Sequence, residues 1–173
     1  MKSVVVLSGG MDSLTALARC IMLGEEVIGL NFQYGSKHNS NENDSVKKIS
    51  EYYKIPLKTI SLDFNDYLKS DLLLSGGDIP EGHYADENMK KTVIPFRNGI
   101  MLSIAAGFAE SIDADQVILG NHAGDHAIYP DCRLVFIDAM SSAIALGTYK
   151  KIQLKKKQCL DGICKKKNIY PIS

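Results

Sequence analysis

The stretch from Val4 to Leu17, VVVLSGGMDSLTAL, constrains the fold of this chain more than any other. A β-branched apolar run ends at Ser8-Gly9-Gly10, and residues at helical spacing begin just after Asp12 and Ser13. Glycines let a backbone approach a ligand closely, and a helix N-terminus offers free N–H groups. Because the two serines add hydroxyl donors, the stretch predicts a phosphate-binding loop between a buried strand and a helix.

Two common phosphate loops are excluded by the residues of this loop. A Walker A loop needs a lysine before its serine or threonine, and a dinucleotide fingerprint needs G-x-G-x-x-G, whereas only Gly9-Gly10 is present. Asp12 would repel phosphates, so we expect it to help start the helix, with some contribution to binding Mg²⁺. The alternative is a plain strand–helix turn, which the full pattern SGGxDS directly after a first strand disfavours.

Strands alternate with helices along the chain. The apolar patterns predict strands at 2–7, 27–32, 57–62 and 116–120, and helices at 12–22, 45–53, 98–112 and 133–146. This order predicts an α/β fold, a Rossmann-like doubly wound and mostly parallel sheet with helices on both faces. Ligands bind at the carboxyl ends of the strands in such a sheet. The irregular segment 63–88 is interpreted as a lid.

Charge is divided unevenly along the 173 residues. Residues 1–148 have the composition of one globular domain, whereas residues 149–173 hold eight lysines and one acidic residue. We interpret 149–173 as a solvated, poorly ordered tail, and an arm that binds nucleic acid is the alternative. Within the tail, the run KIQL is compatible with a short fifth strand.

Membrane and export signals are not expected in this sequence. No apolar run approaches the ~20 residues of a membrane span, and the N-terminus lacks the layout of a signal peptide. The four cysteines are too sparse for a disulfide scaffold. We therefore expect a reduced, cytoplasmic protein.

Four stretches resemble a known enzyme family. SGGMDS is similar to the signature of the PP-loop, or N-type, ATP pyrophosphatases, whose fold is of the adenine nucleotide alpha hydrolase type. Within that superfamily, three stretches resemble 7-cyano-7-deazaguanine synthases: NFQYGSKH (31–38), VIPFRNGIMLSIA (93–105) and ILGNHAGDHAIYPDCRLVFIDAM (118–140). They occur in the order and spacing of that family, and with the loop they cover about residues 2–148.

The resemblance implies a set of site residues. The implied ATP-binding residues are Leu7, Ser8, Gly9, Gly10, Met11, Asp12, Ser13, Leu14 and Thr15. The implied substrate-binding residues are Phe32, Tyr34, Gly35, Arg97, Asn98, Gly120, Asn121, Asp125, Tyr129, Asp131 and Arg133. The implied catalytic residues are Asp12, Ser13, His38 and Arg97.

The chemistry of these side chains agrees with a planar substrate that carries a carboxylate. Phe32 and Tyr34 offer stacking surface, and Arg97 can pair with a carboxylate or a phosphate. Asp125 or Asp131 can accept hydrogen bonds from a guanine-like edge. Each residue also has a purely structural alternative, such as a strand exit, a turn or a surface ion pair.

His38 is assigned to phosphate or proton handling.

The implied enzyme is an ATP-dependent C–N ligase that converts 7-carboxy-7-deazaguanine and ammonia to 7-cyano-7-deazaguanine (preQ0), for queuosine or other 7-deazapurine biosynthesis. ATP would activate first the carboxylate and then the amide oxygen. The implied cofactors are ATP and Mg²⁺.

The resemblance departs from the family pattern after Thr148. The family carries a zinc site there, but Cys159 and Cys164 form only a C-x₄-C pair, so the zinc ligands are not found and no metal-binding residues are assigned. The tail is accordingly interpreted as a diverged or truncated end. A homodimer is compatible with the resemblance, and neither a membrane nor a nucleic-acid partner is expected.

Three alternatives to the full reaction remain at this level. The chain is a synthase variant that stops at the amide, a nucleotide-binding PP-loop protein without turnover, or a PP-loop enzyme that modifies tRNA through its lysine-rich tail.

Overall fold

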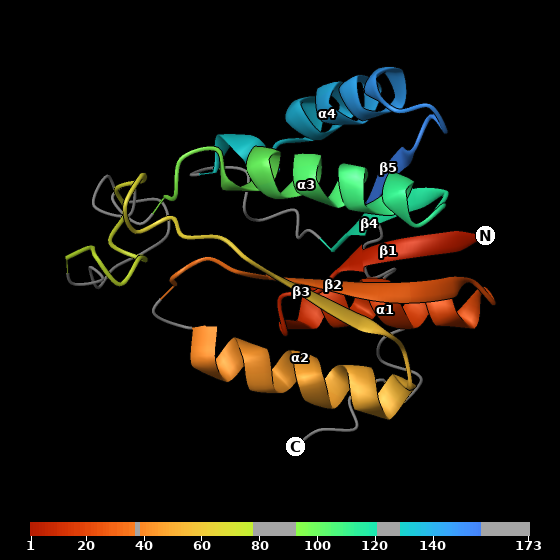
Figure 1. Ribbon diagram of the computed structural model, residues 1–173, viewed down its shortest axis with the longest axis horizontal. Helices are drawn as coiled ribbons and strands as arrows, with labels where there is room; N and C mark the ends of the chain where they lie inside the picture. Colours follow the sequence, from red (N-terminus) through yellow and green to blue (C-terminus); the bar gives the residue numbers. More distant parts are fainter. Residues whose placement is uncertain (37–38, 78–92, 121–128, 157–173) are drawn as a thin grey trace.

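Five parallel strands form the sheet of the computed structural model, which describes residues 1–36, 39–77, 93–120 and 129–156 (Figure 1). The elements in chain order are β1 (Lys2–Val6), α1 (Met11–Met22), β2 (Glu26–Gln33), α2 (Asn39–Tyr53), β3 (Leu57–Ser61), α3 (Arg97–Ser111), β4 (Gln116–Leu119), the 3₁₀ helix η3 (Pro130–Cys132), α4 (Leu134–Gly147) and β5 (Gln153–Lys156). The described helices include none that is long and apolar enough to cross a membrane.

The strand order is β3-β2-β1-β4-β5. Strands β2 and β3 are added on one side of β1, and strands β4 and β5 on the other, so the order of strands reverses between β1 and β4. β1 pairs with β2 through Val4 and Ile28, and with β4 through Val4 and Val117. Parallel strands direct their carboxyl ends to the same edge, and the point where the strand order reverses opens a crevice there. The topology therefore places a ligand site next to the ends of β1 and β4.

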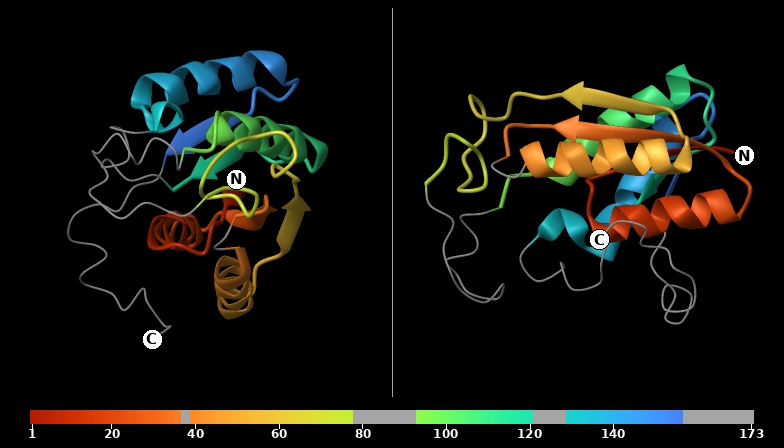
Figure 2. Two further views of the ribbon diagram at one scale, coloured as in Figure 1. Left: turned by 90° about the vertical axis from the view of Figure 1, so that its left-hand side faces the viewer. Right: turned by 90° about the horizontal axis from the view of Figure 1, so that it is seen from below.

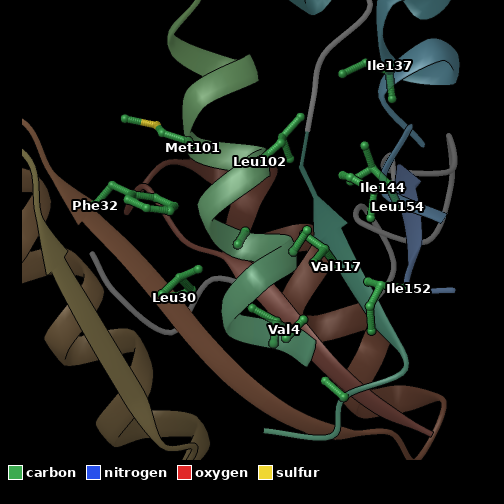
Figure 3. Packing of buried hydrophobic residues seen from close by; sticks show 14 of the residues in the cluster. Val4, Leu30, Phe32, Met101, Leu102, Val117, Ile137, Ile144, Ile152 and Leu154 are labelled. Carbon is green, nitrogen blue, oxygen red and sulfur yellow. The ribbon is translucent and has the colours of Figure 1, made fainter. Parts of the chain in front are cut away.

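Helices cover both faces of the sheet, as the end-on view in Figure 2 shows. α3 and α4 lie on one face, where Leu102 and Ile144 pack with Val4 and Val117 (Figure 3). α1 and α2 lie on the other face and pack against residues such as Val5. The predicted doubly wound α/β fold is confirmed.

The bounds of α2 differ most from the prediction, whereas those of the other helices and strands agree to within two residues. α2 begins at Asn39, six residues before the predicted start. The prediction missed these residues because 39–44 are polar and carry no apolar signal. Only Val46 and Ile49 of this helix are buried hydrophobic residues. The fifth strand does form, at Gln153–Lys156, and pairs with β4. The division of the chain at residue 148 stays a prediction, although the sheet continues beyond it.

The segment after β3 is irregular over residues 63–77, as the sequence predicts. It packs closely nonetheless, since Phe64 and Leu73 are buried and Leu73 forms an isolated bridge with Ser36. The rest of the predicted lid, 78–88, lies outside the described residues, so a closing motion stays a prediction.

Candidate active site

A cavity of about 300 Å³ lies at the carboxyl ends of β1, β2 and β4. This is the edge where the doubly wound topology places a ligand. The described residues that line it are Val6, Leu7, Ser8, Gly10, Met11, Asp12, Ser13, Phe32, Tyr34, Glu42, Arg97, Asn98, Met101, Leu119, Gly120 and Cys132.

The loop after β1 is held together by its two serine hydroxyls. Ser13 Oγ donates to the Gly10 carbonyl at 2.9 Å and accepts from the Ser8 N–H at 3.3 Å. The Gly10 N–H donates to Ser8 Oγ at 3.3 Å. Gly10 is the N-cap of α1 and no side chain caps this helix, so its first N–H groups remain available for an anion. The loop has the geometry of a phosphate site.

Glycine is required on both sides of this loop. Gly9 has φ +82°, and a Cβ there would lie 2.8 Å from the Glu42 carbonyl oxygen. A Cβ on Gly120 would lie 2.5 Å from the carbonyl oxygen of Asp12 and 2.7 Å from Cα of Ser13. The exit of β4 thus contacts the backbone at the start of α1 directly.

Asp12 is the second residue of α1 and is one of the residues that line the cavity. It is not the helix cap, since the N-cap position belongs to Gly10, but a carboxylate in the first turn still complements the helix dipole. No cluster of three or more metal-binding side chains occurs in the described ranges.

Arg97 and Tyr34 form the opposite wall. Arg97 Nη1 donates to Tyr34 Oη at 3.3 Å, and the guanidinium carbon lies 5.8 Å from the centre of the tyrosine ring. Burial lowers the pKa of Arg97, but Tyr34, Asp131 and Cys132 outweigh that effect and raise the pKa above its ordinary value. The guanidinium is consequently a fixed positive charge facing the phosphate loop.

Asp131 caps α3 from a distant part of the chain. Its Oδ2 accepts the Asn98 N–H at 2.8 Å, and Asn98 Nδ2 donates to the Asp131 carbonyl at 3.3 Å and lies 3.2 Å from Cys132 Sγ. The residue at the N-cap of α3 is Phe96, whose side chain cannot accept a hydrogen bond. We did not predict this capping role. A helix start without Ser, Thr, Asp or Asn was the signal that an acceptor must come from elsewhere.

The cavity brings together eleven of the predicted site residues: Leu7, Ser8, Gly10, Met11, Asp12, Ser13, Phe32, Tyr34, Arg97, Asn98 and Gly120. Leu14 and Thr15 are buried in α1 instead. Predicted residues that are described but do not line this cavity also include Gly9, Gly35, Tyr129, Asp131 and Arg133. His38, Asn121 and Asp125 lie outside the described residues.

Glu42 is the charged cavity residue that the sequence analysis missed. It lies in the first turn of α2, four residues after the end of the NFQYGSKH stretch. Its polar neighbours gave no signal that this turn approaches the phosphate loop, although the contact of Gly9 with its carbonyl now shows that it does.

Comparisons with known proteins agree with this site. A sequence profile of the queuosine biosynthesis protein QueC family matches residues 2–169. The 7-cyano-7-deazaguanine synthase of Desulfotalea psychrophila is 49% identical over 154 residues, which cover 88% of this chain and 70% of that protein. The synthase of Porphyromonas gingivalis is 52% identical over 147 residues, which cover 84% and 66%. The chain spans about two thirds of the length of these relatives.

A solved structure shares the fold at low sequence identity. The crystal structure described as a predicted subunit of tRNA methyltransferase from Methanocaldococcus jannaschii has a TM-score of 0.55 and 17% identity, and the match covers 94% of this chain and 70% of that one. This likeness supports the doubly wound fold alone. The profile match and the two relatives show that the chain belongs to the queuosine biosynthesis protein QueC family.

Proposed function

We propose that this chain converts 7-carboxy-7-deazaguanine and ammonia to 7-cyano-7-deazaguanine at the expense of ATP. The observation that carries the proposal is the cavity that joins the Ser8–Ser13 loop to Arg97 at the carboxyl ends of the strands. Relatives at 49% and 52% identity bear the name of this synthase. An anion-binding loop opposite a fixed cation suits a reaction in which ATP activates a carboxylate.

The residues of the cavity have distinct roles in this proposal. The loop amides and the Ser8 hydroxyl bind ATP phosphates, and Arg97 neutralises negative charge on the substrate carboxylate or the leaving phosphate. Ammonia displaces the activated oxygen to give an amide, and a second ATP activates the amide oxygen so that its loss leaves the nitrile. Phe32, Met101 and Leu119 form apolar walls that limit the access of water to the activated carbonyl.

Mg²⁺, a homodimer and a cytoplasmic location belong to the same proposal, whereas zinc does not. The carboxylate of Asp12 fits a cation that ATP itself brings, since it lines the cavity beside the phosphate loop. For zinc, the described cysteines Cys20 and Cys132 are both buried and form no disulfide. Cys159 and Cys164 lie outside the described residues, so no step is assigned to zinc.

A direct assay tests the proposed function. The purified chain is incubated with 7-carboxy-7-deazaguanine, ATP, Mg²⁺ and ammonium, and products are identified by mass. The nitrile is the expected product, and accumulation of the amide alone identifies a variant that stops after one activation. ATP binding without either product would overturn the proposal and leave a nucleotide-binding protein. Salt-sensitive tRNA binding in that case would favour a tRNA-modifying enzyme.

A further inference from the structure

A second cavity, of about 560 Å³, lies beside the start of α3. Three parts of the chain form it: the irregular segment after β3, the turn before α3, and the 3₁₀ helix η3 together with the first turn of α4 that directly follows it. The described residues that line it are Lys69, Val93, Pro95, Phe96, Pro130, Asp131 and Phe136. The residue roles proposed for the first cavity do not involve this second cavity.

The chemistry of the second cavity is that of a site for a flat ring. The rings of Phe96 and Phe136 meet edge to face, with centroids 5.6 Å apart and an interplanar angle of 84°. Pro95 and Pro130 add apolar surface. Phe96 is 57% exposed and has φ +54°, a left-handed conformation that costs free energy for a residue with a side chain. The fold thus holds a large apolar ring at the cavity in a strained backbone.

Asp131 supplies the polar group of this cavity. The residue is 7% exposed, yet it lines the cavity. Its Oδ2 accepts the Asn98 N–H, and among the described residues no hydrogen bond to Oδ1 is present. Oδ1 is not sealed inside the protein, since the fully buried side-chain atom without a partner in the described part of the chain is Gln116 Oε1, and Asp131 lines the cavity. Oδ1 is therefore available to a ligand with N–H groups.

The two cavities are neighbours along the chain at two points. Phe96 lines the second cavity and Arg97 the first, and likewise Asp131 lines the second and Cys132 the first. Consecutive Cα atoms are about 3.8 Å apart, so the walls of the two cavities meet at these residues. At about 300 Å³ the first cavity is at the lower end of the range for ligand sites, which suits one ligand better than two.

We propose that the second cavity binds the guanine-like ring of the carboxylate substrate, with Oδ1 of Asp131 accepting from the ring N1–H and the 2-amino group. Phe96 and Phe136 pack against the ring, and its carboxylate is directed toward Arg97 and the ATP phosphates. The inference rests on the proposed function for the identity of the ligand. It assigns the heterocycle to a subsite separate from the Phe32 and Tyr34 wall, and it gives Asp131 two roles, as helix cap and as reader of the 2-amino group.

The test compares two ligands by calorimetry, without ATP or ammonia. One is 7-carboxy-7-deazaguanine, and the other is its analogue without the 2-amino group. The unmodified chain is expected to bind the first ligand about 10-fold more tightly, the effect of one lost hydrogen bond to a charged group. Asp131→Asn can retain the cap through its amide oxygen. Its NH₂ group would then face the N1–H and 2-amino groups of the ring, and two donors cannot form a hydrogen bond. We expect it to weaken binding of the guanine-type ligand about 10- to 100-fold and to abolish the preference.

Two further variants keep the test decisive. Asp138→Asn makes the same charge change at an exposed position of α4 and should leave both affinities unchanged. Phe136→Leu retains apolar volume without the ring, and we expect it to weaken both ligands about 5- to 10-fold with ATP affinity unchanged. It takes the place of Asp131→Asn if that variant does not fold.

The outcomes separate this inference from the proposed function. If the chain makes nitrile while Asp131→Asn retains its affinity and its preference, or Phe136→Leu binds both ligands normally, the subsite assignment is wrong and the proposed function stands. If binding and discrimination depend on Asp131 but no product forms, the subsite stands and the proposed reaction fails.

Discussion

The two walls of the cavity at the carboxyl ends of β1, β2 and β4 are built in opposite ways. The phosphate loop is local, since its hydrogen bonds join residues no more than five positions apart, such as Ser8 and Ser13. The Arg97 wall depends on contacts across the chain, because Arg97 and Tyr34 are 63 positions apart and Asn98 and Asp131 are 33 apart. A short motif is thus enough to identify the first wall, whereas only the folded sheet assembles the second.

The largest effect is expected from a substitution that tests whether the phosphate loop needs the support of β4. Gly120→Ala would place a Cβ 2.5 Å from the Asp12 carbonyl oxygen, a backbone atom that cannot move without shifting the start of α1. We expect the free energy of unfolding to fall by about 3 kcal/mol and ATP affinity to fall with it. Chemical denaturation and ATP titration measure the two quantities.

Gly107→Ala is the matched control on α3, where nothing lies within 4 Å of the added Cβ. Because glycine is less favourable than alanine inside a helix, the free energy of unfolding of this variant should rise by about 0.5–1 kcal/mol. Normal ATP affinity in Gly120→Ala would show that the loop does not need support from β4.

The next effect concerns the long-range wall. Arg97→Lys retains the positive charge but loses the planar donor pair and the contact with Tyr34, so kcat/KM should fall about 100-fold, or about 2.7 kcal/mol in the barrier. Steady-state kinetics with 7-carboxy-7-deazaguanine varied measure it. Tyr34→Phe removes only a 3.3 Å hydrogen bond, and we expect a loss of about 3-fold. Equal losses in both variants would contradict the placement of Arg97 at the reacting groups.

A smaller effect is expected inside the loop itself. Ser13→Ala removes the hydroxyl that donates to the Gly10 carbonyl and accepts from Ser8, so ATP affinity should fall about 10-fold as the loop loosens. Isothermal calorimetry measures the change. Ser103→Ala removes a similar hydroxyl-to-carbonyl bond on α3, at 2.8 Å from the Gly99 oxygen, away from the cavity. If both variants bind ATP equally well, the loop hydroxyls do not organise the site.

The smallest effect is expected from a contact that is long-range but exposed. Lys150 Nζ lies 3.0 Å from Asp113 Oδ1, and this hydrogen bond and charge hold the pKa of Asp113 below its usual value. Since the pKa is depressed in the folded state, the small stabilisation is present above the unfolded pKa and is lost as pH falls through the folded pKa. Lys150→Met should return the Asp113 pKa toward normal in an NMR titration. An unchanged pKa would show that the pair does not form in solution.

Local patterns were sufficient for the sheet and for the loop. Apolar and β-branched runs predicted four of the strands, and the run KIQL was compatible with the fifth. The signal is clearest in β1 and β4, because central strands of a parallel sheet are buried on both faces and are therefore largely apolar. The start of α2 was missed for the opposite reason: residues 39–44 are all polar in sequence, so they carry no apolar pattern that would predict a helix. Resemblance to a known family, rather than periodicity, supplied Tyr34, Arg97 and Asp131 as site residues.

The sequence by itself determined the fold class, the phosphate loop and the family of this protein, since each depends on residues close together in the chain or on a pattern repeated along it. The tertiary structure decided which residues face each other. It placed Glu42 and Gly120 against the loop, made Asp131 the cap of α3 and opened the second cavity between Phe96 and Phe136. Such contacts arise when the sheet brings distant segments to one edge, and no local spacing of residues encodes them.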